Sequence, residues 1–390
     1  MDNWIDEYFD SHLALLKTLA AIPAPSHHED ERAAFIKDWL EKAGAAGTYI
    51  DEAKNVVLPW GCTAKNESAG GLPPAGGRGD ITVYMAHTDV VFPDLTPLPV
   101  REEDGILYAP GVGDDTANAA ALMTVIRRLL DLNRTPAQPV LFVFNSCEEG
   151  LGNLKGVRQI MKDWAGRVKE VVSFDCTMPG GVVSRAVGSE RWRVTVRTRG
   201  GHSFTDFGAP SAIHRLALLI TRLYEQALPD RAGQHTTYNA GVIRGGTTVN
   251  SIAQEAEMLY EYRSDDKKAL AMMREQFFDI LAAAQTAAGD DASFTKDLLG
   301  ERPCGSEVDP AAARALWDRC ARAVRSVTGA EIVPRSGSTD ANLPLSLGIP
   351  ALTFGLYDGA GEHTREEWLR IDSLKPGLQL AFTLVGEHFV

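Results

Sequence analysis

Residues 81–89 read ITVYMAHTD, a short apolar run that ends in a histidine and an aspartate. A run that is apolar on both faces indicates a strand of a parallel sheet covered on both sides. Such runs alternate with amphipathic helices along the chain, and this alternation predicts an α/β domain whose mostly parallel sheet is flanked by helices. Strands are expected at 81–86, 139–145, 168–174 and 351–354, and helices at 3–21, 29–43, 117–132, 154–164 and 310–327. Ser26 or His27 is expected to cap the second of these helices.

A second domain is inserted into the first. The chain has 390 residues, which is more than one hydrophobic core usually organises. From Val187 onward the strands alternate apolar with polar residues, which is typical of a sheet with one solvated face. These strands are expected at 192–198 and 256–263, and helices at 212–226 and 267–288. We therefore predict an inserted α+β domain with an antiparallel sheet at residues 187–300, within a discontinuous domain of residues 1–186 and 301–390.

The composition excludes several classes of protein. The chain has 39 Lys and Arg residues against 52 Asp and Glu residues, a net charge of −13. Nucleic acid is therefore not an expected partner, because phosphate binding needs clustered positive charge. No window approaches the ~18 apolar residues of a membrane span, and the acidic N-terminus is unlike a signal peptide. Five widely spaced cysteines without a CxxC pair favour a reduced, cytoplasmic protein.

The first candidate site residues end the strand predicted at 81–86. Residues two apart in an extended chain point the same way, so His87 and Asp89 should project together from its carboxyl end. Ligands bind at that end of open α/β sheets, and a histidine beside a carboxylate suits a metal ligand with its orienting partner. The alternative is a buried histidine hydrogen-bonded to an aspartate, which is the commoner arrangement for an isolated pair.

Two adjacent carboxylates, Asp114 and Asp115, precede the long helix in the segment GVGDDTAN, residues 111–118. Helix capping explains one of them, because the first turn of a helix has free N–H groups. Capping explains the second less well. Like charges side by side destabilise each other unless a cation or strong donors compensate.

Further carboxylates and a histidine follow the other buried strands. Glu148 and Glu149 come directly after the strand predicted at 139–145, and Asp175 ends the next one. A solvated turn is one interpretation of the vicinal glutamates. The other is that one carboxylate binds metal while its neighbour acts as a general base on water. With His363, which follows the strand at 351–354, these side chains should meet at one edge of the sheet.

In this ordered set of motifs, His-x-Asp, Gly-x-x-Asp-Asp, Glu-Glu, Asp and His, the chain resembles a family of dizinc metallopeptidases. The family includes peptidase T, carboxypeptidase G, aminoacylase and succinyl-diaminopimelate desuccinylase, and the motifs run in family order from His87 to His363. The resemblance implies a catalytic domain of residues 1–186 and 301–390 and an inserted lid and dimerisation domain. It also implies two zinc ions per chain and a homodimer formed through the lid.

The resemblance also implies a role for each ligand. His87 and Asp175 would hold one zinc ion, and Glu149 and His363 would hold the other. Asp114 would bridge the two ions. Imidazole and carboxylate ligands suit zinc, and no thiolate is required.

The same resemblance extends to catalytic and substrate-binding residues. Glu148 would be the general base, and Asp89 would orient the first histidine ligand. His202, in the segment GGHS, would reach the partner subunit's active site and stabilise the oxyanion. Asn250 and Arg263 would grip the carboxylate or backbone of the substrate, since a guanidinium pairs bidentately with a carboxylate. Apart from the family, His202 is a surface histidine in a turn and Arg263 is an ordinary ion-pair residue.

Thr339 and two departures from the family bear on the substrate. The segment GSTDAN, residues 337–342, resembles the Gly-Thr-Asp segment of the peptidase T branch, so Thr339 would line the substrate pocket. Thr116 stands where many relatives have lysine, and Cys147 stands where an acidic residue is common. Neither departure removes a ligand. A partly buried Cys147 thiol beside two carboxylates should have a raised pKa and be inert.

The predicted function is hydrolysis of amide bonds by a dizinc exopeptidase that acts on short peptides, in the manner of an aminopeptidase or tripeptidase. An N-acyl-amino-acid deacylase is the alternative, because it uses the same metal chemistry. Two other classes are a non-catalytic binding protein with this fold and a thiol hydrolase centred on Cys147. The intact ligand set and Glu148 argue against the first, and the expected pKa of the thiol argues against the second.

Overall fold

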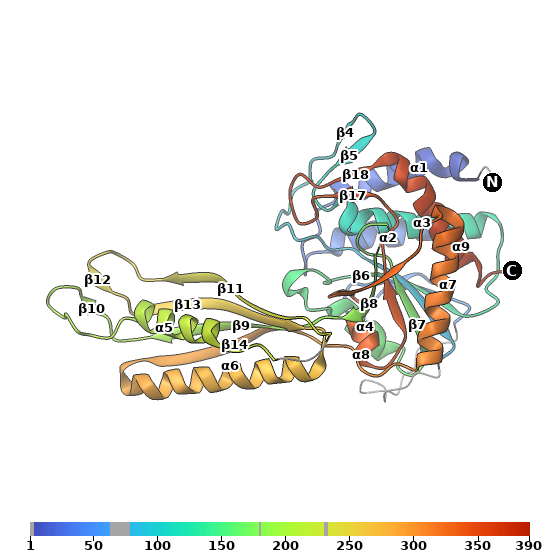
Figure 1. Cartoon of the computed structure of the whole chain (residues 1–390). Coiled ribbons are helices and arrows are strands. Elements are labelled where there is room, and N and C mark those ends of the chain that lie inside the picture. Colours follow the sequence, from blue (N-terminus) through green and yellow to red (C-terminus); the bar gives the residue numbers. More distant parts are fainter. Residues whose placement is uncertain (1–3, 63–78, 179–180, 230–232) are drawn as a thin grey trace. The chain divides into compact units, whose positions relative to one another are not determined.

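The computed structural model describes residues 4–62, 79–178, 181–229 and 233–390. The chain divides into two units (Figure 1). Unit 1 consists of residues 1–186 and 305–390, and unit 2 consists of residues 187–304. Among the described helices, none has both the length and the apolar composition needed to cross a membrane.

Unit 1 is built on an eight-stranded sheet of order β1-β2-β6-β3-β7-β16-β8-β15. In that order its strands are Tyr49–Ile50, Val56–Trp60, Val140–Asn145, Ile81–His87, Val168–Ser173, Ala351–Thr353, Gly181–Ala186 and Val333–Gly337. The four neighbours β6, β3, β7 and β16 run parallel to one another. They are the four strands that the apolar runs predict, so the mostly parallel sheet is confirmed.

Helices cover both faces of this sheet (Figure 1). One face carries α1 (Trp4–Ala21), α2 (Asp30–Lys42), α3 (Asn118–Asp131), α7 (Pro310–Thr328) and α9 (Leu374–Gly386), and the other carries α4 (Lys155–Asp163) and α8 (Asn342–Ser346). Successive residues of a strand point to opposite faces, so Tyr84 and Ala86 pack in the first core while Val83 and Met85 pack in the second. Helix α9 is an element that the sequence patterns do not predict.

A small antiparallel sheet of order β17-β18-β5-β4 completes unit 1. Its strands are Gly359–Ala360, Trp368–Arg370, Ile106–Tyr108 and Arg101–Glu103. Short helical turns lie at Val112–Ala117 (η1), Gly150–Gly152 (η2) and Ile371–Ser373 (η4). Strand β18 pairs with β5, and this pairing brings the loop after β17 beside the loop after β5.

Unit 2 contains a four-stranded antiparallel sheet of order β11-β13-β9-β14. Its strands are Thr236–Gly245, Glu255–Ser264, Gly188–Arg197 and Ser293–Arg302. Helices α5 (Ala212–Glu225) and α6 (Lys267–Ala288) pack against one face, as predicted for a sheet with one solvated side. A two-stranded sheet joins β10 (Gly201–His202) to β12 (Ser251–Ile252), and a short turn, η3, covers Gly289–Asp291.

Candidate metal centre

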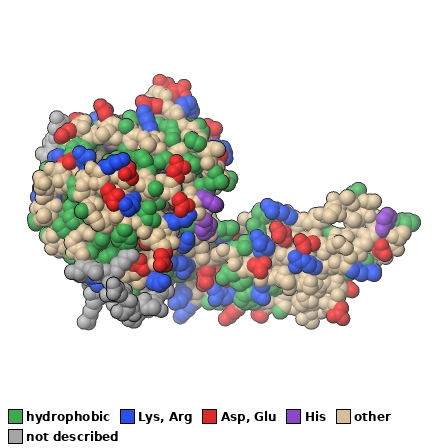
Figure 2. Space-filling view, turned by 180° about the vertical axis from the view of Figure 1, so that it is seen from behind, with side chains coloured by type: hydrophobic (Ala, Val, Ile, Leu, Met, Phe, Trp, Pro, Cys, Tyr) green, Lys and Arg blue, Asp and Glu red, His purple; other side chains and the backbone are tan. Residues whose placement is uncertain are grey.

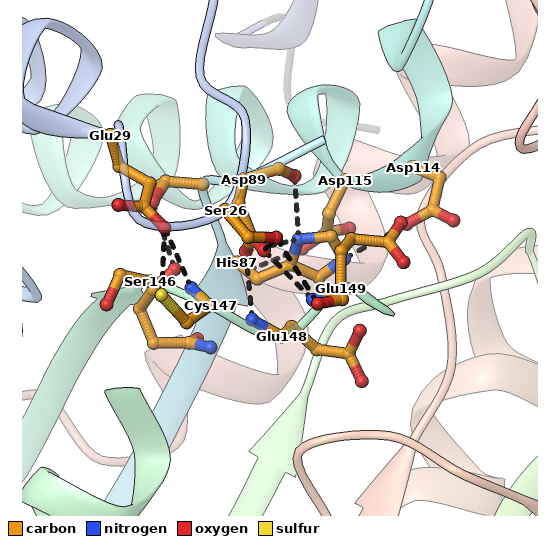
Figure 3. Close-up of polar contacts among 12 residues, drawn as sticks. Ser26, Glu29, His87, Asp89, Asp114, Asp115, Ser146, Cys147, Glu148 and Glu149 are labelled. Atoms are coloured by element: carbon orange, nitrogen blue, oxygen red, sulfur yellow. Dashed lines mark hydrogen bonds and ion pairs between the residues drawn. The ribbon is translucent and has the colours of Figure 1, made fainter. Parts of the chain in front are cut away.

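The carboxyl ends of the central parallel strands collect the candidate ligands of unit 1. His87 is the last residue of β3, Glu149 follows β6, and Asp175 follows β7. Two further residues come from loops at the same edge: Asp114 lies in η1 and His363 in the turn between β17 and β18. The structure therefore brings all five predicted ligands together, and Figure 3 shows three of them with their neighbours.

Two of the groups of possible ligand atoms share Asp114. One group consists of His87, Asp114 and Asp175, and another of Asp114, Glu149 and His363. Within each group, one ligand atom of every residue lies within 4.8 Å of the others. The two carboxylate oxygens of Asp114 face different histidines, at 3.0 Å from His87 Nε2 and 3.3 Å from His363 Nε2. This arrangement suits two cations bound side by side.

Burial differs between the two histidines. The His87 side chain is 1% exposed, whereas that of His363 is 59% exposed. The imidazole of His363 lies 3.2 Å from Oε1 of Glu149, which is itself buried. The centre is therefore enclosed on the strand side and accessible on the side of the β17–β18 turn.

The electrostatics of the cluster favour bound positive charge. Burial and the nearby Asp114 carboxylate raise the pKa of Asp175 to about 7. Hydrogen bonds to Asp114 and Glu149 raise the pKa of His363 to about 11. Burial also raises the pKa of Glu149, since a carboxylate withdrawn from water is harder to ionise. Cations compensate such a cluster of carboxylates, so the donor set fits divalent metal ions.

Asp89 holds the turn after β6 against the end of β3. Its carboxylate accepts hydrogen bonds from the backbone N–H groups of Glu148 and Glu149, each at 2.9 Å, and lies 3.5 Å from His87 Nδ1 (Figure 3). The same ring nitrogen lies 3.1 Å from the backbone oxygen of Asp89. Asp89 therefore contacts the first histidine, as predicted, and also fixes the glutamate pair.

Asp115 does not share the orientation of its neighbour. Its carboxylate accepts a 2.7 Å hydrogen bond from the backbone N–H of His87 and another from the side-chain amide of Asn118. Among the described residues, no side chain caps α3, so the capping interpretation of the two aspartates is wrong. One aspartate faces the centre while the other supports the strand end, because the backbone of η1 is not helical at either residue.

Ser26 supports the site in a way that the sequence patterns missed. Ser26 donates a 2.6 Å hydrogen bond to Asp89. Helix α2 has no side-chain cap, and its N-cap residue is Glu29, so the expected capping by Ser26 or His27 is wrong. No local signal in the sequence could have found this role, because Ser26 and Asp89 are 63 residues apart.

Cys147 lies behind the centre and keeps its proton. Its thiol is buried, donates to Glu29 Oε1 at 3.1 Å and lies 3.3 Å from His27 Nδ1. Burial, with the Glu29 carboxylate beside it, raises the pKa of the thiol to about 12. The raised pKa is thus confirmed, although Glu29 rather than the following glutamates is the neighbour responsible. A protonated thiol is a poor nucleophile, which argues against a thiol hydrolase.

A buried cation, the Arg32 guanidinium, lies against Thr116. The guanidinium of Arg32 donates to the Thr116 hydroxyl at 3.3 Å and to the backbone oxygens of Thr88 and Ile22. Burial lowers the pKa of Arg32 to about 10, so the side chain stays charged at neutral pH. Arg32 therefore ties α2 to the loops that carry His87 and Asp114.

Thr339, which was predicted to line the substrate pocket, lies in unit 1, and its side chain is buried. Its hydroxyl lies 2.9 Å from that of Thr353 on β16 and accepts a hydrogen bond from the backbone N–H of Ala341. The next residue, Asp340, is also buried and accepts a 2.6 Å hydrogen bond from the side-chain amide of Asn145 at the end of β6. These contacts hold the loop that carries Thr339, and its contact with substrate stays a prediction.

The remaining candidates lie in unit 2. The pairing of β10 with β12 brings His202 and Asn250 together, and the backbone N–H of Ser203 donates to the backbone oxygen of Asn250. Arg263 lies on β13, where its guanidinium donates two hydrogen bonds to Glu261, at 2.9 and 3.0 Å. Their contacts with substrate stay predictions.

Comparison with known proteins gives matches across the chain. The family model described as "Peptidase family M20/M25/M40" matches residues 83–387. A succinyl-diaminopimelate desuccinylase of Methylorubrum extorquens is 26% identical over 387 residues, which cover 93% of this chain and 95% of that protein. A tripeptidase of Staphylococcus aureus has a similar fold, with 20% identity, a TM-score of 0.72 and coverage of 96% and 97% of the two chains. A dinuclear metal-binding peptidase of Bacillus subtilis aligns with a TM-score of 0.64 at 16% identity, over 98% of this chain and 99% of that one.

Proposed function

The chain belongs to peptidase family M20/M25/M40 and is a metallohydrolase. From this premise we propose that it is a two-zinc exopeptidase, which removes a terminal residue from short peptides. The observation that carries the proposal is that two groups of possible metal ligands share the carboxylate of Asp114. A shared carboxylate is what a site for two adjacent cations needs.

The residues of the centre fit zinc. Their donor atoms are imidazole nitrogens and carboxylate oxygens, which Zn²⁺ accepts. His87 and Asp175 would hold one ion, Glu149 and His363 the other, and Asp114 would contact both. Two divalent cations held there would supply Lewis acidity, which makes water a nucleophile at neutral pH and polarises a scissile carbonyl.

Glu148 is the general base in this proposal. Its carboxylate belongs to a third group of possible ligand atoms, with those of His87 and Glu149. The hydrogen bond from its backbone N–H to Asp89 fixes the turn that carries it. From this position Glu148 takes a proton from the attacking water and passes it to the nitrogen of the leaving amine.

Residues of unit 2 would recognise the substrate. Asn250 and Arg263 would bind its carboxylate or backbone, and His202 would stabilise the oxyanion. Arg263 already pairs with Glu261 through two hydrogen bonds, so a substrate carboxylate would have to share or displace this partner. A guanidinium has five N–H donors, which makes sharing feasible.

A deacylase of N-acyl amino acids is the second candidate. The observation that favours it is the similarity to a succinyl-diaminopimelate desuccinylase over nearly the whole chain. Removal of an acyl group from an amine breaks the same kind of amide bond, so the proposed ligands and Glu148 would serve both reactions.

A competition screen tests the proposal. Zinc-loaded enzyme is offered di- and tripeptides together with N-succinyl and N-acetyl amino acids, and release of each product is followed by mass spectrometry. We expect kcat/KM for the preferred peptide to exceed that for the best N-acyl amino acid by at least about tenfold, equivalent to about 1.4 kcal/mol of transition-state binding. The reverse ranking would assign the chain to the deacylases.

A homodimer in which His202 acts in the partner's active site is also part of the proposal. Exposed apolar side chains near His202 in the sequence support a dimer interface there, since Phe204 and Phe207 are 83% and 91% exposed. Figure 2 shows hydrophobic side chains next to a histidine at one end of unit 2.

Mixing two inactive variants tests action between subunits. In a symmetric dimer, His202→Ala chains mixed with Glu148→Gln chains form heterodimers with one complete site. Random exchange should then restore about a quarter of the wild-type activity, measured after co-refolding equal amounts. Mixtures as inactive as the separate variants would show that His202 acts within its own chain.

A further inference from the structure

Glu367 is a buried carboxylate that none of the roles above uses. It lies four residues after His363, directly before β18, and is 1% exposed. Its backbone oxygen accepts a hydrogen bond from Ala109, just beyond β5, as part of the contact between the two strands. Its side chain reaches further, into the loop that carries Asp114.

The Glu367 carboxylate accepts three backbone hydrogen bonds from that loop. Oε2 accepts from the N–H of Gly111 at 2.8 Å, and Oε1 accepts from those of Gly113 at 2.9 Å and Asp114 at 2.8 Å. Successive N–H groups that converge on one anion form a nest, which an ionised carboxylate satisfies well. Without an acceptor these buried N–H groups would destabilise the loop.

The loop is shaped for this contact. Gly111 has a φ of +70°, a conformation that favours glycine. At Gly113 a Cβ atom would approach the Tyr357 ring to 2.4 Å, so only glycine allows the ring to pack there. The ring on one side and the Glu367 carboxylate on the other define where the backbone places Asp114.

Glu367 therefore connects two ligands from distant parts of the sequence. His363 Nε2 lies 3.3 Å from Oδ2 of Asp114. Glu367 lies in the same turn as His363, and its carboxylate accepts a hydrogen bond from the backbone N–H of Asp114. We infer that Glu367 is a positioning residue that sets the spacing of Asp114 and His363 for the metal ion they would share with Glu149. This inference rests on the metal centre of the proposed function but does not depend on which amide is cleaved.

The substitution Glu367→Gln tests this role because an amide cannot satisfy all three donors. In either orientation of the amide, its NH₂ group faces at least one backbone N–H, from Gly111 or from the pair at Gly113 and Asp114. The side-chain length is unchanged, so the core around it should keep its packing. Glu366→Gln is the matched control, because Glu366 is the exposed neighbour and undergoes the same chemical change.

The measurement is binding of Co²⁺ to the metal-free full chain, followed by competition with a chelator and by the visible absorption of the bound ion. We expect Glu367→Gln to weaken binding at one or both positions by about 10- to 100-fold and to alter the Co²⁺ spectrum, as loss of a partner behind the ligands does elsewhere. Glu366→Gln should match the wild type in both respects. Unfolding of the metal-free proteins shows whether each variant keeps its fold.

Each outcome bears on the inference. Two Co²⁺ ions bound by Glu367→Gln with the affinity and spectrum of Glu366→Gln would overturn it. If the glutamine variant fails to fold, Glu367→Asp, which keeps the charge but is one methylene shorter, should show a weakened affinity and an altered spectrum, and normal binding would refute the role. A wild type that binds two ions but cleaves no amide would contradict the proposed function alone. A wild type that binds none would contradict both.

Discussion

Replacing Glu148 with glutamine should lower kcat by about 10²–10⁴-fold, which is the usual contribution of a general base. Glutamine has the same length, but its amide cannot take a proton from water. The backbone N–H of residue 148 would still donate to Asp89, so the turn should keep its shape. The measurement is steady-state kinetics on the best peptide of the screen, with zinc content determined on the same sample.

The zinc content separates this role from that of a ligand. The predicted ligands do not include Glu148, so the variant should still hold two ions per chain. Glu366→Gln, an exposed site with the same chemical change, should keep wild-type kinetics. A Glu148→Gln variant with more than about a tenth of the wild-type kcat would contradict the assigned role, because a lost base costs at least ~10²-fold.

A change at one residue, Asp114→Asn, should weaken the binding of both metal ions. The carboxylate of Asp114 belongs to both ligand groups, and its two oxygens face His87 and His363. An amide offers one neutral oxygen in place of two charged ones, so neither group keeps its full charge. We expect fewer than one zinc ion per chain by elemental analysis and a loss of activity of at least about 10³-fold, because both the activated water and the polarised carbonyl depend on the ions.

Two comparisons sharpen this prediction. A strong chelator should abolish the activity of the wild type, and added zinc should restore it. Cys147→Ala should keep its zinc and its activity, since the thiol contacts Glu29 and His27 rather than the centre. Activity that survives chelation but not loss of Cys147 would instead support a thiol hydrolase.

The central strands could be predicted because their signal is local. Strands β6, β3, β7 and β16 are apolar on both faces, and a chain that must bury both faces of a strand shows this in every residue. Strands β15 and β14, which the sequence patterns missed, carry no such signal. In β15, VPRSG, most residues are exposed, and β14 is also largely solvent-facing.

The candidate ligands could be located from the sequence, but the side chains and backbone groups that each one faces could not. Parallel strands deliver their carboxyl ends to one edge, so His87, Glu149 and Asp175 had to lie near one another once the sheet was inferred. Asp114 and Asp115 are identical in type and adjacent in sequence, and nothing local says which one faces the centre. Only the folded backbone of η1 turns one toward His363 and the other toward the N–H of His87.

The sequence by itself therefore determined the four central strands of the sheet, the insert and the residues at the strand ends, because burial and periodicity are properties of neighbouring residues. The tertiary structure alone decided that Ser26 supports Asp89, that Glu29 holds the Cys147 thiol, and that Glu367 binds the loop of Asp114. The two residues of each pair are far apart in the chain. They meet only because the helices and strands that carry them pack together. A hydrogen bond needs both atoms within about 3 Å, and no periodicity in the sequence specifies that distance.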